Sequence, residues 1–131
     1  MIVFCSAASA QSRPGGVIKN FYYWYIHEVD AGRDPFTKGR KTLLTYVTPG
    51  LVKQVERAEA HGEDTDIFLQ TQEFDVRWAD NCDASEVRIN GTTATAIVNF
   101  DAETHYPRLS VTLIKEGSLW KINKVRNAPL R

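Results

Sequence analysis

The sequence contains few of the residues from which covalent or metal-centred sites are built. It has two cysteines and three histidines in 131 residues, and no two histidines have the close spacing of zinc ligands. It has no glycine-rich phosphate loop and no GxSxG nucleophile motif. No segment approaches the eighteen or so apolar residues that a membrane span requires. We therefore expect no metal, no cofactor and no membrane span.

The chain also lacks an excess of charge of either sign. Lys plus Arg equals Asp plus Glu at 16 each, and no run of basic residues offers a phosphate-binding track. Nucleic acid is therefore not an expected partner. The length and the 43% of hydrophobic residues suffice for one domain with a real core.

The N-terminus is typical of the end of a secretory signal. "MIVFCSAASAQS" has a short apolar piece followed by small residues, with Ala8 and Ala10 at the positions of an A-x-A cleavage site. We expect a signal remnant over 1–10, a linker over 11–16 and one domain over 17–131, and thus export as a soluble protein. An apolar N-terminal tail is the alternative. Cleavage leaves Cys82 as the only cysteine, which excludes an internal disulfide in a mature monomer.

The first half of the domain has helical periodicity. Proline at the first helical position after a capping residue marks two of the starts. We expect helices from Val17 to Gly32, from Asp34–Pro35 through Val47, and from Thr48–Pro49 to His61–Gly62.

The second half changes to the two-residue period of β-strands. "EVRINGTTATAIVNF" and "RLSVTLIKEGSLWKINKV" each predict a hairpin, with turns at Asn90–Gly91 and Glu116–Gly117. Helices followed by strands favour an α+β domain. We expect N-terminal helices packed on a curved, mainly four-stranded antiparallel sheet.

The sequence raises one possible catalytic pair and one possible metal-binding loop. Cys82 and His105 could act as nucleophile and base, with an orienting acid from Asp80, Asp83 or Asp101, but acidic neighbours raise the pKa of a thiol and suppress its reactive form. The acidic run Glu63, Asp64 and Asp66 lacks the spacing of a calcium loop, so a solvated turn is favoured. We expect no enzymatic activity.

The stretch "DTDIFLQTQEFDVRWADN", residues 64–81, combines acidic and large apolar side chains. Residues 67–69 are typical of a short helical turn seated on the core. Phe74, Val76 and Trp78 alternate as one buried face of an extended segment would. We expect Asp66 and Asp75 to accept hydrogen bonds in a turn and a cap.

Three motifs resemble those of a known family, namely "FYxWY", "DxFxxxQxFDxxW" and a final "W-K-I" strand. They comprise Phe21, Tyr22, Trp24 and Tyr25; Asp66, Phe68, Gln72, Phe74, Asp75 and Trp78; and Trp120, Lys121 and Ile122. The family consists of small exported bacterial α+β domains of formerly unknown function, shaped like nuclear transport factor 2, and includes type VI secretion amidase immunity proteins. The chain departs from its pattern at Ile67, where proline is common, and at Glu73, where aspartate is.

The resemblance implies a periplasmic immunity protein that inhibits a peptidoglycan amidase effector by occluding its active site. The loop "DAETHYP", 101–107, is longer than a tight hairpin requires and is our first candidate for the contact, with "ADNCDAS", 79–85, as the second. The sequence leaves a homodimer open. The alternative function is a non-catalytic, envelope-associated domain that binds a small ligand in a cavity lined by Tyr23, Trp24 and Trp78. The candidate partner-binding residues are Asp101, Glu103, Thr104, His105, Tyr106, Asn81 and Asp83.

Overall fold

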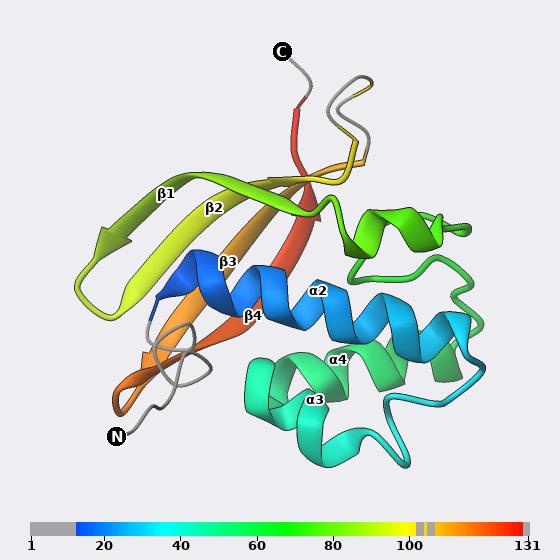
Figure 1. Ribbon diagram of the computed structural model, residues 1–131. Coiled ribbons are helices and arrows are strands. Elements are labelled where there is room, and N and C mark those ends of the chain that lie inside the picture. The colour runs from blue at the N-terminus through cyan, green and yellow to red at the C-terminus, as the bar shows by residue number, and fades with distance from the viewer. Residues whose placement is uncertain (1–12, 102–103, 105–106, 130–131) are drawn as a thin grey trace, which may run out of the picture.

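The computed structural model describes residues 13–101, 104 and 107–129. The expected signal remnant lies outside these residues. Figure 1 shows helices gathered on one face of a twisted, curved sheet. The elements in chain order are α2 (Pro14–Asp30), α3 (Arg40–Tyr46), α4 (Pro49–Ala60), the 3₁₀ helix η1 (Val76–Ala79), β1 (Asp83–Asn90), β2 (Thr93–Asn99), β3 (Arg108–Glu116) and β4 (Leu119–Asn127).

The sheet confirms the predicted fold class. Its order is β1-β2-β3-β4, and every pair is antiparallel. Gly91 and Gly117, both at φ +64°, provide the left-handed backbone that tight hairpins need. Beside β4, Val47 forms a parallel bridge with Ile122, and the Thr48 amide donates to the Ile122 carbonyl at 3.0 Å. The start of α4 is thereby fastened to this edge.

Helix α2 begins at Pro14, three residues before the predicted start at Val17. Proline suits the first helical position because the amide it lacks would have no partner inside the helix. The expected linker 11–16 therefore does not extend beyond Arg13. The helix ends as predicted near Gly32, which adopts φ +76°.

The prediction that a helix starts at Asp34–Pro35 is wrong, because α3 begins only at Arg40. The Asp34 carboxylate accepts from the Phe36 amide at 2.8 Å, and the Asp34 carbonyl accepts from the Gly39 amide at 3.2 Å. These bonds stabilise a turn in place of a first helical turn. The start of α4 agrees with the prediction, since the Thr48 hydroxyl accepts from the Leu51 amide at 3.2 Å.

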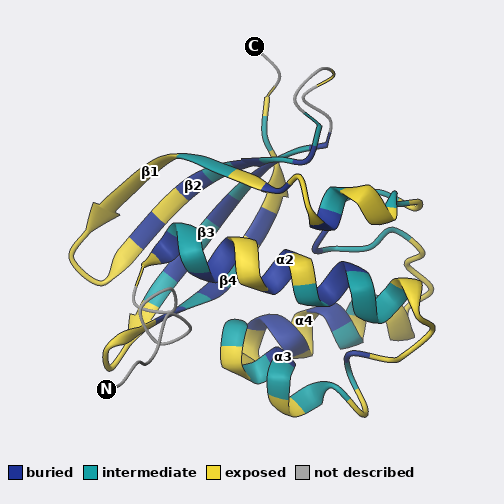
Figure 2. Ribbon diagram, viewed as in Figure 1, coloured by how far each residue is buried: buried dark blue, intermediate teal, exposed yellow. Residues whose placement is uncertain are grey.

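The core lies between α2 and the concave face of the sheet. Helix α2 contacts β1, β2, β4 and η1, and Figure 2 shows buried residues alternating along the strands beneath it. Phe21, Tyr22, Phe68 and Phe100 meet there at ring-centroid distances of 4.9 to 5.0 Å. No helix within the described ranges is long and apolar enough to cross a membrane.

Part of the prediction for residues 64–81 is confirmed and part is wrong. Residues 67–70 form a turn in which Phe68 and Leu69 are buried, as predicted. Val76, however, is 37% exposed and begins η1, so Phe74, Val76 and Trp78 are not one face of an extended segment. The cap that Asp75 provides to the Arg77 amide at 2.9 Å favours a helical turn there.

One buried hydrogen bond joins α2 to this segment, because the Tyr22 hydroxyl donates to the Phe68 carbonyl at 2.6 Å. Tyr22→Phe leaves that buried carbonyl without its donor, so we expect the free energy of unfolding to fall by about 1 to 2 kcal/mol. Urea denaturation measures the change. Tyr23→Phe, at a ring 52% exposed, is the matched control and should have little effect. Equal stability of Tyr22→Phe and the parent would contradict the expectation.

Candidate partner-binding surface

The two segments predicted to bind a partner lie at the same end of the sheet, but 79–85 is not a loop throughout, because Ala79 ends η1 and Asp83–Ser85 begin β1. Asp83 pairs with Asn99, and Asn99 pairs in turn with Arg108. The chain entering β1 therefore lies beside the chain that connects β2 to β3. Glu103, His105 and Tyr106 fall outside the described residues, whereas Asn81, Asp83, Asp101 and Thr104 fall within them.

The described candidate residues also make local contacts. The Asn81 side-chain amide donates to the Arg77 carbonyl at 2.7 Å. This bond provides a partner for a backbone carbonyl of η1. The Thr104 amide donates to the Asp101 carboxylate at 3.2 Å, which is typical of an ordered turn. We call Asp75, Arg77, Asn81, Asp101 and Thr104 the sheet-end surface.

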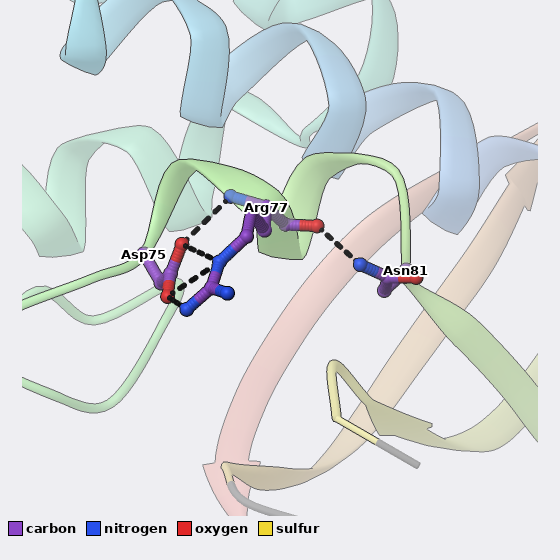
Figure 3. A network of polar contacts seen from close by, with 3 residues as sticks. All are labelled: Asp75, Arg77 and Asn81. Atoms are coloured by element: carbon purple, nitrogen blue, oxygen red, sulfur yellow. Dashed lines mark hydrogen bonds and ion pairs between the residues drawn. The ribbon is translucent and has the colours of Figure 1, made fainter.

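Arg77 is the cation of the sheet-end surface, and sequence reasoning did not single it out. Its guanidinium donates to both Asp75 carboxylate oxygens, with the Nη2 to Oδ2 distance at 2.5 Å (Figure 3). The bonds from the Arg77 side chain and amide lower the pKa of Asp75 to about 2. Hydrogen bonding and charge from Asp75, with a smaller contribution from the charge of Asp101, raise the pKa of Arg77. The spacing of Asp75 and Arg77 in the sequence "DVR" is the feature from which this ion pair could have been predicted.

Aromatic packing fixes η1 relative to the sheet. The Trp78 ring stacks on Phe100 with centroids 5.6 Å apart, and Phe100 directly follows β2 and precedes Asp101. Phe100 is itself buried against Tyr22. The position of η1 therefore follows from the core, and Arg77 is presented from a rigid support with its side chain 81% exposed.

A hollow of about 460 Å³ lies next to η1. Aromatic rings from Phe74 and Trp78 and acidic groups from Glu73 and Asp75 contribute to its wall, which also includes Thr71 and Gln72. An amphipathic hollow beside an exposed arginine is suited to receive a side chain from another protein.

A second hollow, of about 230 Å³, has an acidic wall that includes Glu59, Asp66 and Glu73. Burial raises the pKa of Asp66, although hydrogen bonds from the Tyr25 hydroxyl and from the Leu69 and Phe68 amides oppose the shift. The Tyr25 bond measures 2.6 Å, and the Asp66 carboxylate accepts from both amides. Asp66 is thus a turn acceptor, as predicted. No cluster of three or more His, Cys, Asp or Glu in the described ranges could hold a metal ion.

The thiol of Cys82 is poorly suited to nucleophilic catalysis. It is buried, and burial is the main reason that its pKa rises to about 12. A thiol with this pKa stays protonated near neutral pH, whereas a cysteine nucleophile acts as the thiolate. This observation disfavours the pairing of Cys82 with His105 that the sequence raised.

The three rings expected to line a ligand cavity are separated. Tyr23 is 52% exposed and packs on His27, Trp24 packs near Tyr46, and Trp78 stacks on Phe100. Fully buried side chains such as Phe21, Tyr22 and Phe68 occupy the space between helices and sheet. The separation of the three rings does not favour the single cavity that they were predicted to line.

Comparison with known proteins supports the fold. No protein-family model matches the sequence, and no curated protein matches it. A chain of the type VI native effector-immunity complex Tae3-Tai3 from Ralstonia pickettii has a TM-score of 0.79 and 23% identity, covering 92% of this chain and 99% of its own. A chain of the selenomethionine form has a TM-score of 0.74 and 22% identity, with coverage of 91% and 99%.

A third similar structure is a protein of unknown function from Bacteroides thetaiotaomicron, with a TM-score of 0.54 and 15% identity, covering 91% of this chain and 89% of its own. At these identities the likeness establishes a shared fold. It confirms, at the level of fold, the resemblance predicted from the sequence motifs.

The raised pKa of Asp66 predicts a pH dependence of stability. The folded state binds the Asp66 proton more tightly than the unfolded chain does, so this carboxyl lowers stability at neutral pH. This loss of stability diminishes as the pH falls through the pKa of Asp66 in the folded state toward its pKa in the unfolded chain, near 4. Asp66→Asn should therefore gain stability relative to the parent as pH rises from about 4 to 7. Urea denaturation at a series of pH values measures the difference.

Asp75→Asn is the matched control, since the pKa of Asp75 is shifted in the opposite direction to about 2. The contribution of Asp75 to stability is complete above its unfolded pKa and is lost as pH falls through about 2. The difference in unfolding free energy between Asp75→Asn and the parent should stay constant between about pH 5 and 7. A constant difference in unfolding free energy between Asp66→Asn and the parent from about pH 4 to 7 would show that the pKa of Asp66 is not raised.

Proposed function

We propose that this chain is a periplasmic, non-enzymatic immunity protein that binds a type VI secretion peptidoglycan amidase effector and occludes its active site. The observation that supports this most is the fold shared with a chain of an effector-immunity complex across 92% of the protein. The buried, protonated Cys82 thiol favours the immunity member of such a pair over its effector. The expected secretory signal would deliver the protein to the compartment that contains peptidoglycan.

The sheet-end surface is the part of the molecule that we assign to the effector. It presents a rigidly supported arginine, two chain segments and an adjoining hollow of about 460 Å³, which together resemble an interface with one anchoring residue and a receiving pocket. A complex of standard size buries about 1,600 Å² in total. We expect loop 101–107 to enter the amidase cleft, where Glu103 or His105 would form hydrogen bonds with the catalytic groups and exclude substrate.

The first experiment is to coexpress the full chain with the product of the adjacent gene. We expect the two proteins to purify as a stable complex, and the purified chain to inhibit hydrolysis of peptidoglycan by that partner. Absence of a complex, together with undiminished amidase activity, would refute the proposal.

Charge reversal at Arg77 tests the assigned surface. Arg77→Glu should weaken effector binding at least tenfold, about 1.4 kcal/mol, because an exposed arginine beside a pocket is typical of a binding hot spot. Lys53→Glu, the same change of charge at an exposed position on α4, should bind as the parent does. Calorimetry gives both affinities, and urea denaturation checks that both variants remain folded. Equal weakening by the two variants would indicate a general charge effect instead of a local contact.

The long loop needs a separate test. His105→Ala combined with Tyr106→Ala should reduce effector affinity at least tenfold, about 1.4 kcal/mol, if the loop is the plug. Inhibition of the amidase should weaken in parallel. Unchanged affinity would move the interface away from loop 101–107 and leave η1 as the main candidate.

A further inference from the structure

The two hollows described above adjoin one another along segment 71–74. Thr71, Gln72, Glu73 and Phe74 contribute to the walls of both, and Figure 1 shows this segment within the green loop that joins α4 to η1. We call the two hollows, with the residues that line them, the acidic groove. Its larger part, of about 460 Å³, lies within the size range of small-ligand sites.

Negative charge is concentrated in the acidic groove. The carboxylates in its walls belong to Glu59, Glu63, Asp64, Asp66, Glu73 and Asp75, and none of the described lining residues is basic. The ion pairs among the described residues include Asp75, which pairs with Arg77, but none of the other five. Because the chain as a whole has equal numbers of basic and acidic residues, the groove differs from the average surface in charge.

Two of these carboxyls are disfavoured in their charged form. Partial burial raises the pKa of Glu59, and the charges of Asp66, Asp34 and Glu56 raise it further. Burial also raises the pKa of Asp66. A positive charge brought into the groove would favour the charged form of both carboxyls.

Aromatic rings make the groove amphipathic. Phe74 lines both hollows and Trp78 lines the larger one, where the stack on Phe100 fixes the Trp78 ring. Lysine and arginine combine an apolar stem with a charged head, and a cation is attracted to the face of an aromatic ring. An acidic side chain would be repelled, and an apolar one would exclude water from carboxylates without giving them a partner. The groove therefore fits a basic side chain.

Tertiary contacts hold the wall of the groove in a strained conformation. Gln70 has φ +58°, a left-handed backbone that costs energy in a residue other than glycine. Its amide donates to the Asp66 carbonyl at 2.6 Å, and the Asp66 amide donates to the Thr71 carbonyl at 3.0 Å. The Asn127 side chain, at the end of β4, donates to the Gln70 side chain at 3.4 Å. Strain of this kind clusters at ligand-binding sites, and a fixed wall lowers the entropic cost of binding.

We propose that the acidic groove receives a lysine or arginine side chain of the effector. The stem of that side chain packs on Phe74 and Trp78, and its charged head lies near Glu73, the acidic residue common to both hollows. The inference rests on the proposed function for the identity of the partner, and it adds the class of residue that the partner must present.

Neutralisation of Glu73 tests the groove in the complex. Glu73→Gln keeps the shape of the side chain and removes its charge, so it should weaken binding of the adjacent gene's product by roughly tenfold, because hydrogen bonds to charged groups contribute more than neutral ones. Glu116→Gln, the same change at the end of β3, is the matched control and should bind as the parent does. Calorimetry measures the affinities.

The outcomes separate the two proposals. A parent that fails to bind the adjacent gene's product would refute the proposed function. A parent that binds, together with a Glu73→Gln variant of equal affinity, would refute the role of the groove and leave the proposed function standing.

The class of side chain is tested with this chain alone. N-acetyl-arginine amide and N-acetyl-lysine amide should each shift the NMR signal of the Trp78 indole N–H, which Trp78→Phe identifies. N-acetyl-citrulline amide has nearly the shape of the arginine probe without its charge and should give little shift. Glu73→Gln should weaken the response to the basic probes, and Glu116→Gln should not. Equal responses to the arginine and citrulline probes, or no response to either basic probe, would overturn the assignment of a basic side chain.

Discussion

Burial of the aromatic face of α2 is the constraint on which the rest of the structure depends. Phe21 and Tyr22 are fully buried. Phe21 contacts Phe68 from segment 64–81, and Tyr22 contacts Phe100, which directly follows β2. Residues far apart in the chain must therefore meet at one point on the concave face of the sheet. The hydrogen bond from the Tyr22 hydroxyl to the Phe68 carbonyl is directional. It therefore fixes the orientation of segment 64–81 relative to α2, in addition to the burial of Phe68.

The sheet-end surface follows from this packing. The Tyr22 to Phe68 hydrogen bond holds the segment that precedes η1 against α2. Trp78 stacks on Phe100, and Arg77 lies close enough to Asp101 for their charges to interact. An interface built on such a support loses little conformational freedom when it binds, which favours affinity. Burial of Asp66 in the wall of the second hollow has a cost, because desolvation raises the pKa of this carboxyl while hydrogen bonds from the Tyr25 hydroxyl and the Leu69 and Phe68 amides oppose the shift.

Local patterns predicted the elements better than they predicted the surface. The hairpins, the fold class and the caps at Thr48 and Asp75 all depend on residues close in sequence. The errors arose where two local signals compete: the turn-forming side chain of Asp34 delays α3, and the cap at Asp75 converts an alternating pattern into η1. The Trp78 to Phe100 stack joins residues 22 positions apart in the sequence, and no local pattern specifies such a contact.

The sequence by itself determined the α+β class, the order of helices and strands, and the motifs whose resemblance pointed to immunity proteins, because periodicity, caps and turns act over a few residues. Only the tertiary structure decided that segment 79–85 lies beside the chain that follows β2 and that the Trp78 to Phe100 stack supports Arg77 at that end of the sheet. It also decided that Val87 and Ile89 remain exposed on the edge strand β1, because exposure depends on which elements pack against a strand and not on its local sequence.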